Sequence, residues 1–86
     1  MLKVLITSAQ IRAARSFLRW SAQDLAEHSG VGISTIKRLE LMEGVPSAQT
    51  RILASIHKAL ESAGIEFIGS PSDAPGVRLR AVRDEL

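Results

Sequence analysis

The stretch from residue 21 to residue 40, SAQDLAEHSGVGISTIKRLE, decides the fold of this chain. Ser21, followed three residues later by Asp24, is a capping box, in which each side chain binds a backbone N–H of the first helical turn. Gly30 follows a short segment with helical apolar spacing, where a left-handed residue commonly ends a helix. Helical spacing resumes over residues 33–41. The stretch therefore predicts two short helices joined by a tight turn that contains glycine.

A first helix precedes this stretch and carries the same start signature. Thr7 and Gln10 form a capping box, and Ile6 and Ile11 are placed to form a hydrophobic staple across it. Each device satisfies backbone N–H groups that the first helical turn leaves unpaired. The two signatures together predict where consecutive helices begin.

A longer fourth helix follows. Pro46 stops the third helix, because proline cannot continue a helix from its interior and restricts the residue before it. We expect Ser47 to cap the fourth helix and Gly64 to end it. One stripe of this helix is apolar, made of Ile52, Leu53, Ile56, Ala59, Leu60 and Ala63.

Beyond residue 64 the apolar period changes to two, which is typical of strands. The first run contains Ile65 and Phe67, and the second contains Val77, Leu79 and Ala81. Residues 69–76 between them are rich in proline, serine and glycine and predict a loose connecting loop. The sequence thus predicts a mainly α fold, with a four-helix domain over residues 1–64 and a C-terminal β-hairpin tail over residues 65–86.

Length and composition support one soluble domain. The 86 residues are 45% apolar and 23% charged, an ordinary globular balance. There is no apolar run of about 18 residues that could span a bilayer, and residues 1–6 are too short for a secretory signal core. We expect a cytoplasmic protein. Cysteine is absent, so disulfides and thiolate metal sites are excluded.

Basic residues gather in two places along the chain. The first 20 residues hold four basic side chains and no acidic one, and the tail holds three more: Lys3, Arg12, Arg15 and Arg19, then Arg78, Arg80 and Arg83. This distribution is typical of a surface that meets a polyanion, although a solvated charged face produces the same pattern.

Two short helices with a glycine-containing turn form a helix-turn-helix, whose second helix fits the major groove of DNA. Helical hairpins also occur in proteins that never bind DNA, so geometry alone does not decide the function. The sequence LAEHSGVGISTIKRLE at 25–40 resembles the phage-repressor and Cro-like family of helix-turn-helix regulators. QIRAAR at 10–15 and Pro-Ser at 46–47 extend the resemblance to roughly residues 7–64.

The resemblance implies a role for several positions. The recognition helix would cover about residues 33–41, and the base-reading residues would be Ile33, Ser34, Lys37 and Arg38. Arginine can bind guanine through two hydrogen bonds, and an apolar side chain can pack on a thymine methyl group. Thr35 would lie toward the phosphates, and Arg12, Arg19 and Gln23 are further candidates for contacts with the DNA backbone.

The family commonly buries an ion pair between its first helix and the end of the recognition helix, and Arg15 and Glu40 stand at those positions. Two positions depart from the family pattern. Gly32 replaces the serine or threonine that usually caps the recognition helix, and Ala22 replaces a glutamine that usually contacts a phosphate. Gln23 is the nearest residue able to take over that contact.

The sequence does not favour an enzyme. His28 and His57 lie on different predicted helices without ligand spacing, the serines stand where caps and turns explain them, and no glycine-rich phosphate loop is present. We expect no cofactor, no metal and no small-molecule ligand. The open alternative is an antitoxin or accessory module whose tail binds a partner protein.

We also expect a homodimer, because one recognition helix buries too little surface for tight specific binding and two copies read two half-sites. A lone hairpin is marginal in water, so its strands must pack on the helices or pair with another chain. We favour pairing between copies, through Ile65, Phe67, Val77 and Leu79.

Overall fold

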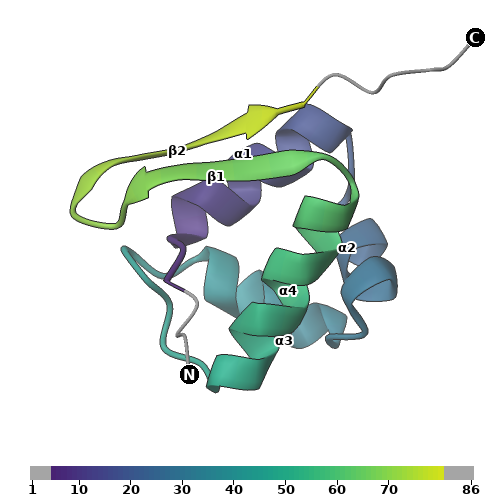
Figure 1. The fold of residues 1–86 in the computed structure, drawn as a ribbon. Coiled ribbons are helices and arrows are strands. Elements are labelled where there is room, and N and C mark those ends of the chain that lie inside the picture. The colour runs from purple at the N-terminus through teal and green to yellow at the C-terminus, as the bar shows by residue number, and fades with distance from the viewer. Residues whose placement is uncertain (1–4, 81–86) are drawn as a thin grey trace, which may run out of the picture.

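The computed structural model describes residues 5–80 as four helices followed by a two-stranded antiparallel hairpin (Figure 1). The elements are α1 (Ser8–Leu18), α2 (Ala22–Ser29), α3 (Ile33–Glu40), α4 (Thr50–Ser62), β1 (Ile65–Ser70) and β2 (Asp73–Leu79). The predicted mainly α fold with a C-terminal hairpin is therefore confirmed. Ala81, Lys3 and Arg83 lie outside the described residues.

The start signals of α1 and α2 and the stop signal of α2 act as the sequence predicts. The Thr7 hydroxyl accepts from the Gln10 N–H at 3.0 Å, and the Gln10 amide oxygen accepts from the Thr7 N–H at 2.8 Å. Ser21 and Asp24 make the same reciprocal pair at 2.9 and 3.0 Å. Gly30 ends α2 in the left-handed conformation, with φ of 76°. These devices depend only on residues within one turn of each other, so local sequence specifies them.

Two helix boundaries differ from the prediction. α3 ends at Glu40, with Leu41 as its C-cap, and α4 begins at Thr50 with Gln49 rather than Ser47 at its N-cap. Residues 45–49 run between the helices without helical structure, and this segment buries Pro46 against the rest of the molecule. Packing of the connection on the core therefore delays the helix start past the local capping signal.

The core gathers residues from every helix and from the first strand. Its largest fully buried side chains include Ile11, Leu25, Ile36, Leu39, Ile56, Leu60 and Ile65. No helix here is longer than 13 residues, so the helices depend on this shared apolar packing for their stability. In the part of the chain that the structure describes, no helix is long and apolar enough to cross a membrane.

The hairpin packs on α1 and α4 of its own chain. Its register pairs Ile65 with Leu79 and Phe67 with Val77. The predicted loop over residues 69–76 is wrong, since most of these residues belong to the strands and only residues 71–72 form the turn. A bulge permits this, since Gly69 of β1 lies opposite two residues of β2, Ala74 and Pro75. Glycine is required at this position of β1, because any Cβ there would lie 2.0 Å from the backbone oxygen of Ala74.

Candidate nucleic-acid interface

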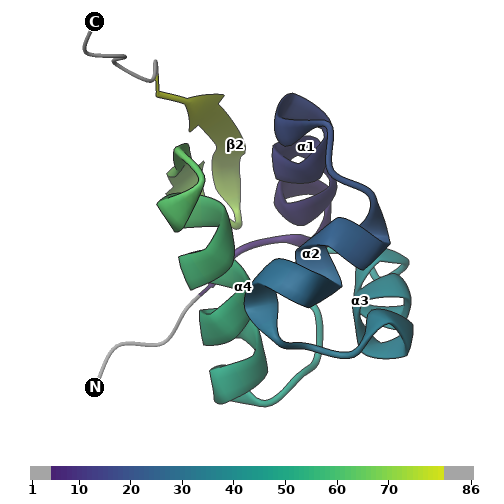
Figure 2. The ribbon, with the colours of Figure 1, turned by 90° about the vertical axis from the view of Figure 1, so that its right-hand side faces the viewer.

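α3 lies on the side of the molecule away from the hairpin (Figure 2). The side of α3 that faces solvent is a polar strip. Ser34, Lys37 and Arg38 are all exposed, and their spacing of three and four residues places them on one helical face. Ile36 and Leu39 on the opposite face are 1% and 0% exposed. Helical periodicity alone thus separates the buried side of α3 from its solvent-facing side.

The strip continues to Leu41, which sequence reasoning missed. Leu41 follows Ser34 by seven residues, or two helical turns, and is 85% exposed. It is the most exposed large apolar residue in the described chain. The resemblance that implies Ser34, Lys37 and Arg38 does not extend to this position, whereas helical spacing from Ser34 would have found it.

Ile33 and Thr35 are less available than the other predicted contact residues. Both are half-buried, and Ile33 packs against the core from the first turn of α3. Part of the Ile33 surface still lines a shallow groove between α2 and α3, together with Gln23 and Glu27. Ile33 therefore serves packing first, and only its outer surface can meet a ligand.

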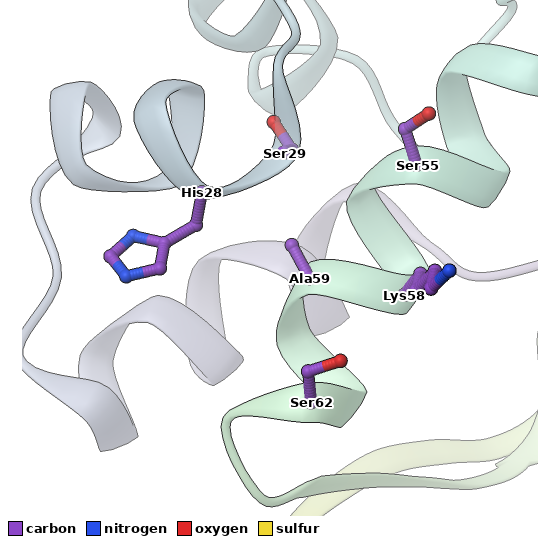
Figure 3. Close-up of a pocket in the computed structure, with 6 residues that line it drawn as sticks. All are labelled: His28, Ser29, Ser55, Lys58, Ala59 and Ser62. Atoms are coloured by element: carbon purple, nitrogen blue, oxygen red, sulfur yellow. The ribbon is translucent and has the colours of Figure 1, made fainter.

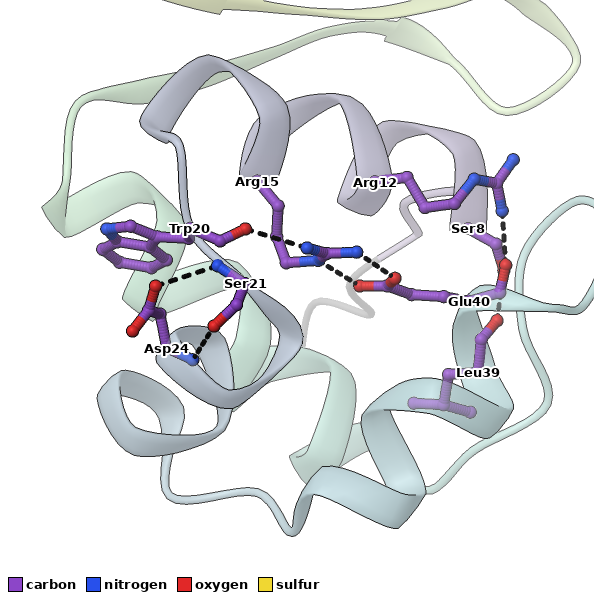
Figure 4. A network of polar contacts seen from close by, with 8 residues as sticks. All are labelled: Ser8, Arg12, Arg15, Trp20, Ser21, Asp24, Leu39 and Glu40. Carbon is purple, nitrogen blue, oxygen red and sulfur yellow. Dashed lines mark hydrogen bonds and ion pairs between the residues drawn. The ribbon is translucent and has the colours of Figure 1, made fainter.

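Side chains of α1 hold the C-terminal end of α3 (Figure 4). The last carbonyl groups of a helix have no partner within it. The Ser8 hydroxyl donates to the Leu39 carbonyl at 2.7 Å, and the Arg12 guanidinium donates to the Glu40 carbonyl. Cationic donors are favourable at this negative end of the helix dipole. α3 is thereby fixed at one end, and no segment within residues 5–80 covers its outer face.

Arg15 and Glu40 form the ion pair that joins α1 to α3 (Figure 4). The guanidinium donates from Nε and Nη2 to the two carboxylate oxygens, each at 2.7 Å, and from Nη1 to the Trp20 carbonyl at 2.8 Å. The hydrogen bond to Glu40 raises the pKa of Arg15 above its ordinary value, against a smaller opposing effect of burial. Arg15 therefore stays charged and linked to three acceptors.

The predicted backbone-contact residues are placed in different ways. Arg12 is exposed but already binds the Glu40 carbonyl. Arg19 is exposed and caps α1 in the left-handed conformation, with φ of 59°. Gln23 is exposed on α2 and donates to the Glu27 carboxylate at 3.1 Å. Two of these three side chains, those of Arg12 and Gln23, therefore already have partners within the chain.

Both histidine side chains stack on aromatic rings of their own chain. His28 stacks on Trp20 with ring centroids 4.1 Å apart, and His57 stacks on Phe67 at 4.8 Å. Within residues 5–80, no group of three histidine or acidic side chains is arranged to hold a metal ion. A pocket between α2 and α4 is lined by His28 and Lys58 with three serines, but the imidazole and the ammonium point to opposite sides (Figure 3). These polar groups do not converge on one ligand.

The proposed dimer residues need a correction. Ile65 is 0% exposed and belongs to the core of its own chain, so it cannot contact a second copy. Phe67 and Val77 are half-buried and pack against the same core, whereas Leu79 remains 39% exposed. The inner face of the hairpin is used within the chain, because packing on α1 and α4 gives these strands the support that a lone hairpin lacks.

No protein family and no curated protein matches this chain in sequence. The functional assignment therefore depends on the exposed face of α3 and on the contacts that hold it.

Proposed function

We propose that this protein is a sequence-specific DNA-binding regulator of the phage-repressor type, which binds double-stranded DNA by placing α3 in the major groove. Its role is binding rather than catalysis, and such a protein works beside the chromosome in the cytoplasm. A helix-turn-helix commonly binds as a dimer, with two recognition helices about 34 Å apart.

The observation that carries the proposal is the uncovered strip on α3. Ser34, Lys37 and Arg38 face solvent on a helix whose other side is fully packed. An α-helix has the width that the major groove admits. A strip covered by its own chain would have excluded this function, and no described segment of the chain covers it.

The chemistry of the strip suits base recognition. The Arg38 guanidinium can donate two hydrogen bonds to guanine O6 and N7, and Lys37 can reach guanine or a phosphate. Ser34 can bind either partner of a base pair, so it adds little discrimination. Arg38 is therefore the residue on which specificity should depend most.

The test is selection of bound sequences from random duplex DNA at a stated salt concentration, because affinity for DNA falls steeply with salt. We expect a palindromic motif. Arg38→Ala should lose preference at one position of each half-site, at a cost of about 1 to 3 kcal/mol. Lys58→Ala is the matched control, since it removes one exposed positive charge from α4 and should leave the motif unchanged.

Two results would argue against the proposal. Selection that yields no motif at low salt would remove sequence-specific binding. If Arg38→Ala weakens binding to every duplex equally, Arg38 contacts a phosphate, and the strip on α3 has lost the residue on which base recognition should depend most.

The second candidate is an antitoxin or accessory protein that binds a partner protein. Exposed apolar side chains away from α3 favour it, among them Leu5, which is 53% exposed, and Phe17 on α1, which is 50% exposed. Isolation of the chain from its own cells distinguishes the two functions. A stoichiometric second polypeptide that stays bound after nuclease treatment would support the partner-binding function.

A further inference from the structure

In the part of the chain that the structure describes, backbone N–H and C=O groups along the outer edge of β2 have no hydrogen-bond partner. The Arg80 N–H donates to the Gly64 carbonyl at 2.9 Å, so residues 64 and 80 form a hydrogen-bonded pair. Such pairs alternate in an antiparallel ladder. Val77 and Leu79 therefore belong to the other class of pair, in which the N–H and C=O groups point away from the neighbouring strand. Within residues 5–80, no other backbone or side-chain group binds them.

β2 is the more open of the two strands. Most of its residues are exposed, whereas β1 begins with a fully buried residue and continues directly from α4. Pro75 is tolerated at an edge, since it has no N–H to leave unpaired. For the same reason it can donate nothing to a second strand, so pairing depends on the N–H and C=O groups of Val77 and Leu79. An unpaired edge with free backbone groups is a template for another strand.

Apolar surface lies beside this edge. α1 and β2 pack together and run in the same direction (Figure 1). Gln10 of α1 donates to the Gly76 carbonyl at 2.9 Å. Phe17 lies two turns after Gln10 on the same side of α1, about 10 Å further along. Leu79 lies three residues after Gly76, also about 10 Å along. Phe17 and Leu79, which are 50% and 39% exposed, are thus at the same distance along the shared direction of α1 and β2.

The charges of β2 fit antiparallel pairing with itself. The strand begins at Asp73, and basic residues stand at its other end, Arg78 and Arg80. Pairing Val77 with Val77 of a second copy sets Arg80 opposite Ala74 of that copy, one residue from Asp73, twice by symmetry. Because the bulge adds a residue between Asp73 and Gly76, Asp73 lies on the same face of the sheet as Arg80. The same register sets Arg78 opposite Gly76 of the second copy. A register shifted by one residue along each strand would instead set the two Arg78 side chains opposite each other. Opposite charges across a ladder stabilise it and like charges destabilise it.

We infer that the outer edge of β2 pairs antiparallel with the same edge of a second copy, forming a four-stranded sheet across a two-fold axis. Phe17 and Leu79 of both copies are covered at this junction. The inference rests on the proposed DNA-binding function for its purpose, since the dimer supplies the second recognition helix. Its structural basis is independent of that function.

Sedimentation equilibrium of the purified full chain without DNA tests this interface. The chain should sediment at twice its 9.3 kDa mass. Leu79→Lys should raise the dissociation constant of the dimer by about tenfold or more, because it places a charge in the covered junction. Ile68→Lys is the matched control, since Ile68 is 38% exposed on the other face of the same hairpin and should leave the dimer intact.

Val77→Pro tests the edge itself, because it removes an N–H that the chain's own ladder does not use. This variant should be monomeric with the helical circular dichroism of the parent. A parent that stays monomeric at about 100 µM, where even weak dimers form, would overturn the inference. So would equal effects of Leu79→Lys and Ile68→Lys. A dimer that selects no DNA motif would instead leave the interface standing and remove the proposed function.

Discussion

Glu40→Ala should destabilise the fold strongly, because Glu40 is the acidic partner of a largely buried ion pair. Its side chain is 9% exposed and that of Arg15 is 22% exposed. Removing one partner of a buried pair costs roughly 3 to 5 kcal/mol, since it leaves an uncompensated charge. Arg15 keeps its bond to the Trp20 carbonyl and some contact with water, so we expect the lower end of this range.

The loss is large against the stability of a domain of this length, about 4 to 13 kcal/mol. One kcal/mol shifts the melting temperature of a domain of this length by about 4 to 8 °C, so a loss of about 3 kcal/mol lowers it by about 12 to 24 °C. Thermal unfolding followed by circular dichroism at neutral pH measures this shift directly.

Glu66→Ala is the matched control. The Glu66 carboxylate accepts from Arg78 Nε at 2.7 Å, the same distance as in the buried pair, but the two side chains are 38% and 63% exposed. An exposed pair contributes about 0 to 1 kcal/mol, so this variant should melt within a few degrees of the parent. Equal shifts for Glu40→Ala and Glu66→Ala would refute the argument that burial sets the cost.

The pH dependence of the same pair has a definite sign. Because the pKa of Arg15 is raised in the folded state, its contribution is present at every pH below the ordinary arginine value and is lost only at more alkaline pH. The contribution of the Arg15 charge should therefore be constant between neutral and mildly alkaline pH. A contribution that falls between pH 7 and 9 would show that Arg15 loses its proton far below the expected range.

Two further substitutions test other contacts by thermal unfolding. Gly69→Ala should lower the free energy of unfolding by about 1 to 3 kcal/mol, because the added Cβ would overlap the Ala74 backbone and Gly69 has a positive φ. Gly32→Ala is the control, since its Cβ meets no atom within 4 Å, and it should change stability by less than about 1 kcal/mol. Similar effects at both glycines would contradict the bulge geometry. Gln10→Glu keeps the acceptor of the capping box but sets a carboxylate against the Gly76 carbonyl, so it should destabilise the fold at neutral pH. Stability should recover as the pH falls, because the carboxyl gains a proton that it can donate to that carbonyl. A deficit that does not change between pH 7 and pH 4 would be evidence against this contact.

Local signals in the sequence accounted for most of the helical architecture. The capping boxes at Thr7 and Ser21 and the left-handed Gly30 depend on residues within one turn, so the chain specifies them before it folds. The exposed positions on α3 also follow from spacing alone, because a period of 3.6 residues separates one helical face from the other.

The sequence could not show which part of the chain, or which other molecule, would pack against a given side chain. Ile65 carried the strand signal correctly, yet only packing on α1 and α4 decided that it would enter the core rather than an interface. Gln10 was recognised as a capping residue, but its amide also reaches the hairpin 66 residues away. Contacts of such separation depend on the whole fold.

By itself the sequence determined where α1, α2 and α3 begin, which faces are apolar, and that a hairpin follows, since these depend on short-range hydrogen bonding and side-chain period. Only the tertiary structure decided that the hairpin covers its own helices and that Leu39 and Glu40 are both held by α1. The physical reason is that a pattern records a side chain's preference for burial, whereas its partner is set by the packing of distant elements.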